Sequence, residues 1–516
     1  MREALTICCV LALGGTASAV RPRSHEAALL KEDFQVIQRN SDAMGRCRVA
    51  LPRQFAKPAA CTFEIDDARG IIRSGVVQSE RTGGDQTALL KSIPVGGPYT
   101  VTVDVKGPEH SWKRSFRNVL VGDIWVLGGQ SNMYGIDAIK ENLPALPYLN
   151  MLDCQHIRLN AHWCAAVPPI HRIPEQFASF TLKSQHPEWS EAQVRHTLAE
   201  GKPVGGIDCS YFFAKRLYRE TGVPIGLVPC ATGGALAIWD PSLREQNRYG
   251  FLAHQVATAG GRVKGLLFYQ GEQDAIFGDE QKPVASPSLI YPIRTYGQQF
   301  KAFVDAFRHD FGEDIPVLFA QICRHHQNKL DRARGWEIIR ETQRQLPEIL
   351  PRSHCVPTID LDVVDGLHLD YDSQKRLGAR MAFLALPYVN PAVGAKPVVG
   401  VKPAVGPRNE IKLASVRLVR RPRPVITVEF SGVTGRLRAA GRPTGFQLND
   451  KRTGKPLDWI YKIDLEAARP QTAILHVAFE NDRDVVLYYG AGMAPYVNIV
   501  DENDMPIPAF GPIDVK

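Results

Sequence analysis

Four short apolar runs in the middle of the chain constrain its fold more than any other feature. They cover residues 124–127, 225–228, 265–269 and 317–322. Continuous apolar runs of this length are typical of parallel strands that are buried on both faces. Segments with helical periodicity, such as residues 211–220 and 296–309, lie between the runs. This alternation of strands and helices predicts a doubly wound α/β domain, for which we set the limits at residues 119 and 390.

Segments with a different pattern lie on both sides of this middle region. Residues 33–118 contain short stretches in which apolar and polar residues alternate, and they predict an N-terminal β-sandwich. Residues 391–407 repeat valine, glycine, lysine and proline, a composition that predicts an extended linker. The strand-like runs 425–430, 473–479 and 485–489 then predict a C-terminal β domain over residues 408–516.

The first residues have the features of an export signal. Arg2 precedes an apolar run from Leu5 to Leu13, and Ala17-Ser18-Ala19 provides the small residues of a cleavage site. The run is too short to span a bilayer as a helix. We therefore expect a signal peptide over residues 1–19 and a secreted protein, extracellular or periplasmic, that is not membrane-bound after cleavage.

The cysteines and the charge exclude some classes of protein. Two of the ten cysteines lie in the leader, which leaves an even number that permits disulfides; Cys154 and Cys164 could close a short loop, but free thiols are an equally good interpretation. The spacings indicate no zinc site. The net charge of +8 is small for 516 residues, and the basic segment 417–423 predicts an exposed strand edge, so we expect no nucleic-acid partner.

Polar and glycine residues follow the predicted middle strands. Ser131 follows the first strand, Gly233 and Gly234 follow the second, and residues 270–274 follow the third. Ligands of doubly wound sheets bind beyond the carboxyl ends of the strands. These segments, together with the late Asp365-Gly-Leu-His368, are therefore expected to meet at one edge.

The residue types at this edge are those of acyl transfer. A serine needs a neighbouring base to accept its proton, and His368 can serve as that base for Ser131. One turn brings the Asp365 carboxylate to the imidazole, where it can orient the ring. Asp360 and Asp362 are rival orienters, but their spacing to His368 does not fit a one-turn pair.

Other side chains are weaker candidates for the site. Arg324-His325-His326 could contact substrate, but adjacent histidines without a third ligand do not indicate a metal. Glu272 is either a general base or a buried structural partner of a backbone amide. Trp163, Trp189 and Trp239 could stack on sugar rings, although at least two of them are expected to pack in the core or in loops.

The motifs together resemble a known superfamily. The first block of the SGNH hydrolases, in the form found in sialate O-acetylesterases and related carbohydrate acetylesterases, is similar to Val121-Gly-Asp-Ile-Trp-Val-Leu-Gly-Gly-Gln-Ser-Asn-Met133. The similarity continues through Pro224-Ile-Gly-Leu-Val, Gly233-Gly234, Tyr269-Gln-Gly-Glu272 and Asp365-Gly-Leu-His368. Further similar segments in both flanking regions extend the resemblance over nearly the whole mature chain.

This resemblance implies a flavodoxin-like, three-layer α/β hydrolase domain flanked by β-sandwich-like domains. It implies Ser131 as nucleophile, His368 as base and Asp365 as its orienter, with no cofactor and no metal. The implied oxyanion hole uses the Ser131 amide and Gly234, together with donors among Gln270, Gly271 and Gln273. The third block departs from the superfamily's Gly-x-Asn-Asp, since it reads Gly271-Glu-Gln273-Asp274, so either Gln270 or Gln273 replaces the asparagine. Possible substrate contacts are Gln130, Asn132, Glu272, Trp239 and His325.

The function expected from the resemblance is the removal of O-acetyl groups from carbohydrates, including acetylated sialic acid. Two alternatives are an SGNH hydrolase that acts on another acyl ester and a non-catalytic glycan-binding protein. The intact Ser131, Asp365 and His368 argue against the binding protein, and the missing asparagine favours it. The sequence identifies neither the sugar nor the oligomeric state.

Overall fold

The computed structural model describes most of the chain after residue 26. The described residues are 27–55, 57–82, 84–153, 161–173, 175–200, 204–243, 247–278, 292–326, 333–389, 410–420, 422–479 and 484–516. The predicted signal peptide (1–19), the predicted linker (391–407) and Cys154 lie outside these ranges.

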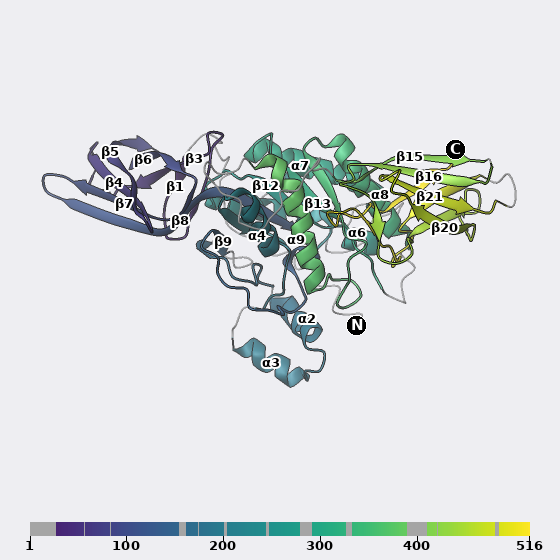
Figure 1. Ribbon diagram of the computed structural model, residues 1–516. Helices are drawn as coiled ribbons and strands as arrows, with labels where there is room; N and C mark the ends of the chain where they lie inside the picture. The colour runs from purple at the N-terminus through teal and green to yellow at the C-terminus, as the bar shows by residue number, and fades with distance from the viewer. Residues whose placement is uncertain are drawn as a thin grey trace.

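A mostly parallel sheet forms the centre of the molecule (Figure 1). From one edge to the other, its described strands are β10 (His162–Ala165), β9 (Leu149–Asp153), β11 (Ile225–Pro229), β8 (Ser111–Gly129), β12 (Gly265–Tyr269), β13 (Val317–Gln321) and β14 (Ser353–Pro357). Only β10, at one edge, runs antiparallel to its neighbour. The first three predicted strands lie within β8, β11 and β12, and the fourth coincides with β13 except for its last residue, so the expected α/β sheet is confirmed.

Amphipathic helices cover this sheet. The longer ones are α4 (Ser210–Thr221), α5 (Arg248–Thr258), α7 (Tyr296–Phe311), α8 (Ala333–Ile349) and α9 (Tyr371–Ala385). In α7 the buried residues Phe300, Phe303 and Phe307 recur at helical spacing and form the apolar stripe that faces the core. Every residue of β11, β12 and β13 is buried, as expected for strands covered on both faces.

Four further helices lie near the carboxyl ends of the strands or outside the central body. They are α1 (Ser131–Tyr134), α2 (Glu175–Gln185), α3 (Glu191–Ala199) and α6 (Glu272–Phe277). Helices α2 and α3 project from the body of the molecule (Figure 1). In α3 the Ser190 side chain and Gln193 form a capping box, which fixes where this helix begins.

The N-terminal region forms a mainly antiparallel β structure with its own hydrophobic core. Its strands are β1 (Ala28–Leu29), β2 (Val36–Gln38), β3 (Met44–Ala50), β4 (Ala60–Asp67), β5 (Gly70–Thr82), β6 (Asp85–Pro94), β7 (Gly96–Lys106) and the first part of β8. Strands β1 and β2 pair in parallel with β3 and β8, respectively. Strand β8 pairs with β7 through residues 111–121 and then with β11 and β12 in the central sheet. The predicted boundary between residues 118 and 119 therefore falls inside one continuous strand.

The C-terminal region contains two four-stranded antiparallel sheets and a two-stranded one, at the opposite end of the molecule from the N-terminal strands (Figure 1). The first four-stranded sheet consists of β15 (Lys412–Val419), β16 (Val425–Ser431), β21 (Thr472–Val477) and β20 (Ile460–Leu465). The second consists of β19 (Pro456–Leu457), β18 (Phe446–Asp450), β22 (Val485–Tyr489) and β24 (Phe510–Asp514). The two-stranded sheet consists of β17 (Arg438–Ala439) and β23 (Ile499–Val500). The apolar side chains of this region belong to the same cluster as those of the central sheet. Strand β15 is a sheet edge, as its basic segment predicts.

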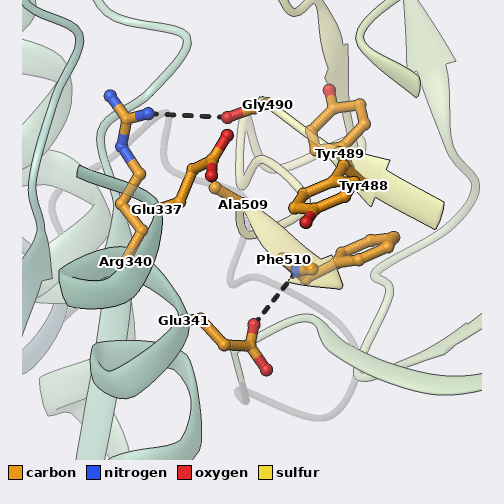
Figure 2. Close-up of a pocket in the computed structure, with 9 residues that line it drawn as sticks. Glu337, Arg340, Glu341, Tyr488, Tyr489, Gly490, Ala509 and Phe510 are labelled. Atoms are coloured by element: carbon orange, nitrogen blue, oxygen red, sulfur yellow. Dashed lines mark hydrogen bonds between the residues drawn. The ribbon is translucent and has the colours of Figure 1, made fainter. Parts of the chain in front are cut away.

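Arg340 of α8 joins the C-terminal region to the central domain. Its guanidinium is buried and donates hydrogen bonds to the carbonyls of Cys323 (2.7 Å), Gly492 (2.6 Å) and Met493 (3.1 Å). Figure 2 shows Arg340 reaching Gly490 beside a small pocket between α8 and the C-terminal strands, where Glu341 accepts from the Gly511 amide. None of Ser131, Asp365 and His368 lines this pocket.

Two general observations concern the described residues alone. Cys164 and the six other cysteines described are free thiols, so the structure gives no support to a Cys154–Cys164 bridge, of which one partner lies outside the described ranges. None of the helices described is both long and apolar enough to cross a membrane.

Candidate active site

The structure brings the serine, the histidine and the aspartate into contact in series. His368 Nε2 lies 2.9 Å from Ser131 Oγ, and His368 Nδ1 lies 2.6 Å from Asp365 Oδ2. The second carboxylate oxygen of Asp365 accepts hydrogen bonds from the amides of Leu367 (3.1 Å) and His368 (2.9 Å). Although burial raises the pKa of Asp365, the hydrogen bond and the charge of His368 outweigh it and lower that pKa to about 2. The carboxylate therefore stays ionised and holds the imidazole in place.

The end of β8 fixes the position of Ser131. Gly129 has a φ of 128°, and a Cβ there would lie 2.1 Å from the Tyr269 carbonyl oxygen of β12. Only glycine allows this bend and this close approach. The chain turns directly into α1, whose first residue is Ser131, and the serine is partly exposed at the carboxyl edge of the sheet.

Asp360 does not compete with Asp365 for the histidine. Its carboxylate is paired with Arg376 (2.9 Å) and Arg380 (2.6 Å) of α9. Asp362 pairs with Arg324. The spacing argument that favoured Asp365 therefore agrees with the geometry.

The loop that follows β11 lies beside Ser131. The Thr232 amide donates to the Gly129 carbonyl (2.8 Å), and the Leu236 amide donates to Asp274 Oδ2 (3.0 Å). These bonds hold Gly234 between the ends of β8 and β12. Burial raises the pKa of Asp274 to about 6, while its bonds from Gln270 and Leu236 act in the opposite direction.

The third block faces the side chain of Gln130. Gln130 Oε1 accepts from Gln270 Nε2 (3.3 Å) and from the amides of Gly271 (3.3 Å) and Gln273 (3.4 Å). All three predicted donors of this block, Gln270 Nε2 and the amides of Gly271 and Gln273, thus have a partner within the protein. Gln270 is buried, and its Nε2 also donates to Asp274 Oδ2 and to the Gly234 carbonyl (3.5 Å), so the structure favours neither glutamine as the replacement for the missing asparagine.

Asn132 and Glu272 were predicted as possible substrate contacts, but both side chains are directed into the protein. Asn132 Nδ2 donates to Glu272 Oε1 (2.6 Å), and both residues are buried. The prediction of a substrate contact is wrong for both, because their polar atoms are enclosed by the protein. The Glu272 carboxylate accepts from the side-chain amide of Asn132 and also has a hydrogen bond from its own backbone amide. Burial raises the pKa of Glu272 to about 7.

Trp239 and His325 are corrected in the same way. Trp239 is 0% exposed and packs edge-on against Phe268 and Phe303 in the core, so no sugar can stack on it. His325 is buried against Trp336, and burial lowers its pKa to about 4. It is therefore a neutral core side chain beside the catalytic loop and not a surface contact.

Sequence reasoning missed the residues of α2 that border the site. The Phe180 ring is 49% exposed, and its centroid lies 6.2 Å from that of His368. Ser184 Oγ lies 3.5 Å from Asp365 Oδ2. The segment between residues 136 and 205 carries no motif. Only a helical pattern with a lone exposed phenylalanine could have indicated that these residues border the site.

A second histidine–aspartate pair was also missed. His171 Nδ1 lies 2.9 Å from Asp208 Oδ2, and His171 Nε2 accepts from the Ala231 amide (3.4 Å) in the loop after β11. The two residues are 37 positions apart, and no sequence pattern connects them. Within the described ranges no group of three or more His, Cys, Asp or Glu side chains is arranged to hold a metal ion.

The chain is similar to known carbohydrate esterases. A family model described as carbohydrate esterase, sialic acid-specific acetylesterase, matches residues 121–386. A protein of Arabidopsis thaliana named probable carbohydrate esterase is 27% identical over 267 residues, which cover 50% of this chain and 88% of that relative. The sialate O-acetylesterase of Homo sapiens is 22% identical over 258 residues, which cover 46% of this chain and 47% of that protein.

A solved structure is similar over nearly the whole chain. The crystal structure of a carbohydrate acetylesterase from Xanthomonas citri superposes with a TM-score of 0.61 at 20% identity, and the match covers 94% of this chain and 98% of that one. At this identity the likeness shows the fold alone. The family model, however, matches just over half of the residues and includes Ser131, Asp365 and His368. The chain therefore belongs to the sialic acid-specific acetylesterase family of carbohydrate esterases and is a carboxylic ester hydrolase.

Proposed function

We propose that this protein removes O-acetyl groups from carbohydrates through a Ser131–His368–Asp365 acyl-enzyme mechanism on an SGNH-type domain. The observation that carries the proposal is the unbroken series of contacts from the Ser131 hydroxyl through the His368 ring to the Asp365 carboxylate. Family membership supports the acetylated carbohydrate as the substrate class.

In the first half of the reaction, Ser131 Oγ attacks the acetyl carbonyl carbon. His368 Nε2 takes the hydroxyl proton, and Asp365 stabilises the resulting imidazolium. The tetrahedral intermediate collapses as the imidazolium returns this proton to the sugar oxygen, so the sugar leaves as an alcohol. In the second half, a water loses its proton to His368 and attacks the acetyl-serine. Acetate leaves, and Ser131 regains its proton.

The oxyanion is proposed to be bound by the amides of Ser131 and Gly234. Each such donor contributes about 2.7–4 kcal/mol to the stability of the transition state. Gln270 Nε2 and the amides of Gly271 and Gln273 are left out, because all three donate to Gln130 Oε1. Gln270 Nε2 also donates to Asp274 Oδ2.

The leaving sugar is proposed to lie against Phe180. This half-exposed ring lies beside His368, which returns the proton to the sugar oxygen. Aromatic faces pack well on the apolar faces of sugar rings.

We also retain the proposals of a secreted protein with the domain limits 33–118, 119–390 and 408–516.

Release of acetate from acetylated substrates tests the proposal. The purified protein should hydrolyse an aryl acetate, and the Ser131→Ala variant should lose this activity. A panel of O-acetylated sialic acid, acetylated xylan and longer acyl esters then compares carbohydrate acetates with other esters. Equal rates for the wild type and Ser131→Ala would eliminate the serine mechanism, and a preference for longer acyl chains would eliminate the acetyl specificity.

A further inference from the structure

The side chain of Asn132, which directly follows the nucleophile, contacts the backbone on both sides of His368. Asn132 Oδ1 accepts a hydrogen bond from the Leu369 amide (2.8 Å). Asn132 Nδ2 donates to the Leu367 carbonyl (3.3 Å). A single amide group thus bonds to the residue before the histidine and to the residue after it.

These two contacts also fix which end of the amide is oxygen. A backbone N–H can only donate and a carbonyl can only accept, so the Leu369 amide requires Oδ1 and the Leu367 carbonyl requires Nδ2. Any other orientation would leave buried polar groups without partners, which costs about 1–3 kcal/mol for each group.

Three further side chains hold this arrangement. Glu272 Oε1 accepts from Asn132 Nδ2 at 2.6 Å, and Gln374 Nε2 of α9 donates to the Asn132 carbonyl at 2.9 Å. The Cys323 thiol donates to the same Leu367 carbonyl (3.1 Å). Asn132, Glu272 and Gln374 are all at most 1% exposed, so solvent cannot replace their bonds.

We propose that Asn132 is a positioning residue that holds the loop of His368 in register with Ser131, and that Glu272 holds Asn132. The inference rests on the proposed function, because it assigns no chemistry to Asn132 and acts through the histidine. It connects the first, third and last sequence motifs through one buried amide. Displacement of a reacting group by about 1 Å can lower a rate by about 100-fold.

Asn132→Asp is the most direct test. The variant keeps the shape and the acceptor for Leu369, but it places an oxygen against the Leu367 carbonyl and Glu272. We expect kcat on an aryl acetate to fall by about 10–100-fold with little change in KM. We expect the proton of the hydrogen bond between His368 and Asp365 to give a far-downfield NMR signal in the wild type, and this signal should shift or broaden in the variant.

Glu272 provides a second pair of variants. Glu272→Gln keeps an acceptor for Asn132 Nδ2, whereas Glu272→Leu removes it. We therefore expect Glu272→Gln to stay within about threefold of the wild-type kcat and Glu272→Leu to resemble Asn132→Asp. If both Glu272 variants lost activity equally, the charge of Glu272 and not its hydrogen bond would be responsible, and its proposed role would be wrong.

Asn150 supplies a matched control. It is also buried, and its amide donates to the carbonyls of Phe34 (2.6 Å) and Asn118 (3.1 Å), away from the triad. Asn150→Asp should lower the free energy of unfolding and leave kcat and the NMR signal unchanged. Wild-type kcat and an unshifted signal in Asn132→Asp would overturn the inference. An active Ser131→Ala variant would instead overturn the proposed function, and the NMR signal would still test the role of Asn132.

Discussion

Among the described residues, the pairs His368–Asp365 and His171–Asp208 share a short contact between Nδ1 and the carboxylate but differ in their surroundings. In the pair of His368 and Asp365 the side chains are 9% and 21% exposed, and Nε2 faces the Ser131 hydroxyl. In the pair of His171 and Asp208 the side chains are 3% and 0% exposed, and Nε2 accepts from the Ala231 amide. The Nδ1–carboxylate distances are 2.6 and 2.9 Å.

A histidine–aspartate pair alone does not make a catalytic base. What differs is the group that Nε2 contacts and its access to solvent. A hydroxyl at a partly exposed edge can give up its proton to the ring, whereas a backbone amide cannot. We infer that the buried pair supports the loop that carries Gly234 and that only the exposed pair takes part in proton transfer.

Substitution of each histidine should give the largest difference between the two pairs, in both kcat and melting temperature. In His368→Gln, kcat should fall by about 10⁴-fold or more, because the serine loses its base, and the melting temperature should change little. In His171→Gln, kcat should fall far less and the melting temperature should drop. Steady-state kinetics and thermal unfolding of the same two preparations would measure both effects. A comparable loss of kcat in both variants would contradict the distinction.

The aspartates should differ in stability. Asp208→Ala removes the acceptor of His171 and also that of the Ser210 amide (2.8 Å), so we expect the free energy of unfolding to fall by about 3 kcal/mol. Asp365→Asn should cost less stability, because its carboxylate is partly solvated. Denaturant titrations would compare the two variants, and a larger loss in Asp365→Asn would reverse the assignment.

The contribution of the Asp365 carboxylate to the free energy of unfolding should depend on pH. The folded pKa of Asp365 is lowered to about 2, so its carboxylate stabilises the fold above its unfolded pKa near 3.8. This contribution, about 1–2 kcal/mol, is lost as the pH falls from about 4 through 2. The difference in unfolding free energy between the wild type and Asp365→Asn should therefore shrink over that range. A constant difference would mean that the lowered pKa does not contribute.

The smallest expected effect concerns Phe180, whose ring lies beside His368 of the catalytic pair. Phe180→Ala should raise KM for an acetylated oligosaccharide by about three- to tenfold, the loss of one aromatic contact. KM and kcat for a small aryl acetate should stay the same. Phe180→Tyr is the control, since it keeps the aromatic face. Equal effects on both substrates would place the ring in the acetyl site and not against the sugar.

The sequence predicted those features that depend on local pattern. The four buried strands follow from continuous apolar runs, and the contact of Asp365 with His368 follows from a spacing of one turn. Features that depend on tertiary contacts were missed. The pair of His171 and Asp208 and the approach of Phe180 join segments with no shared motif, and the position of Trp239 in the core was not evident from its place after a glycine-rich block.

Strand β8 begins at the edge of the N-terminal sheet and ends two residues before Ser131. Because the same backbone serves both sheets, no flexible hinge separates the N-terminal unit from the reactive hydroxyl along this path. A recombination or truncation at residue 118 would cut through a hydrogen-bonded strand. The N-terminal region is thus joined to the central domain through one hydrogen-bonded strand, whose far end leads directly to the serine.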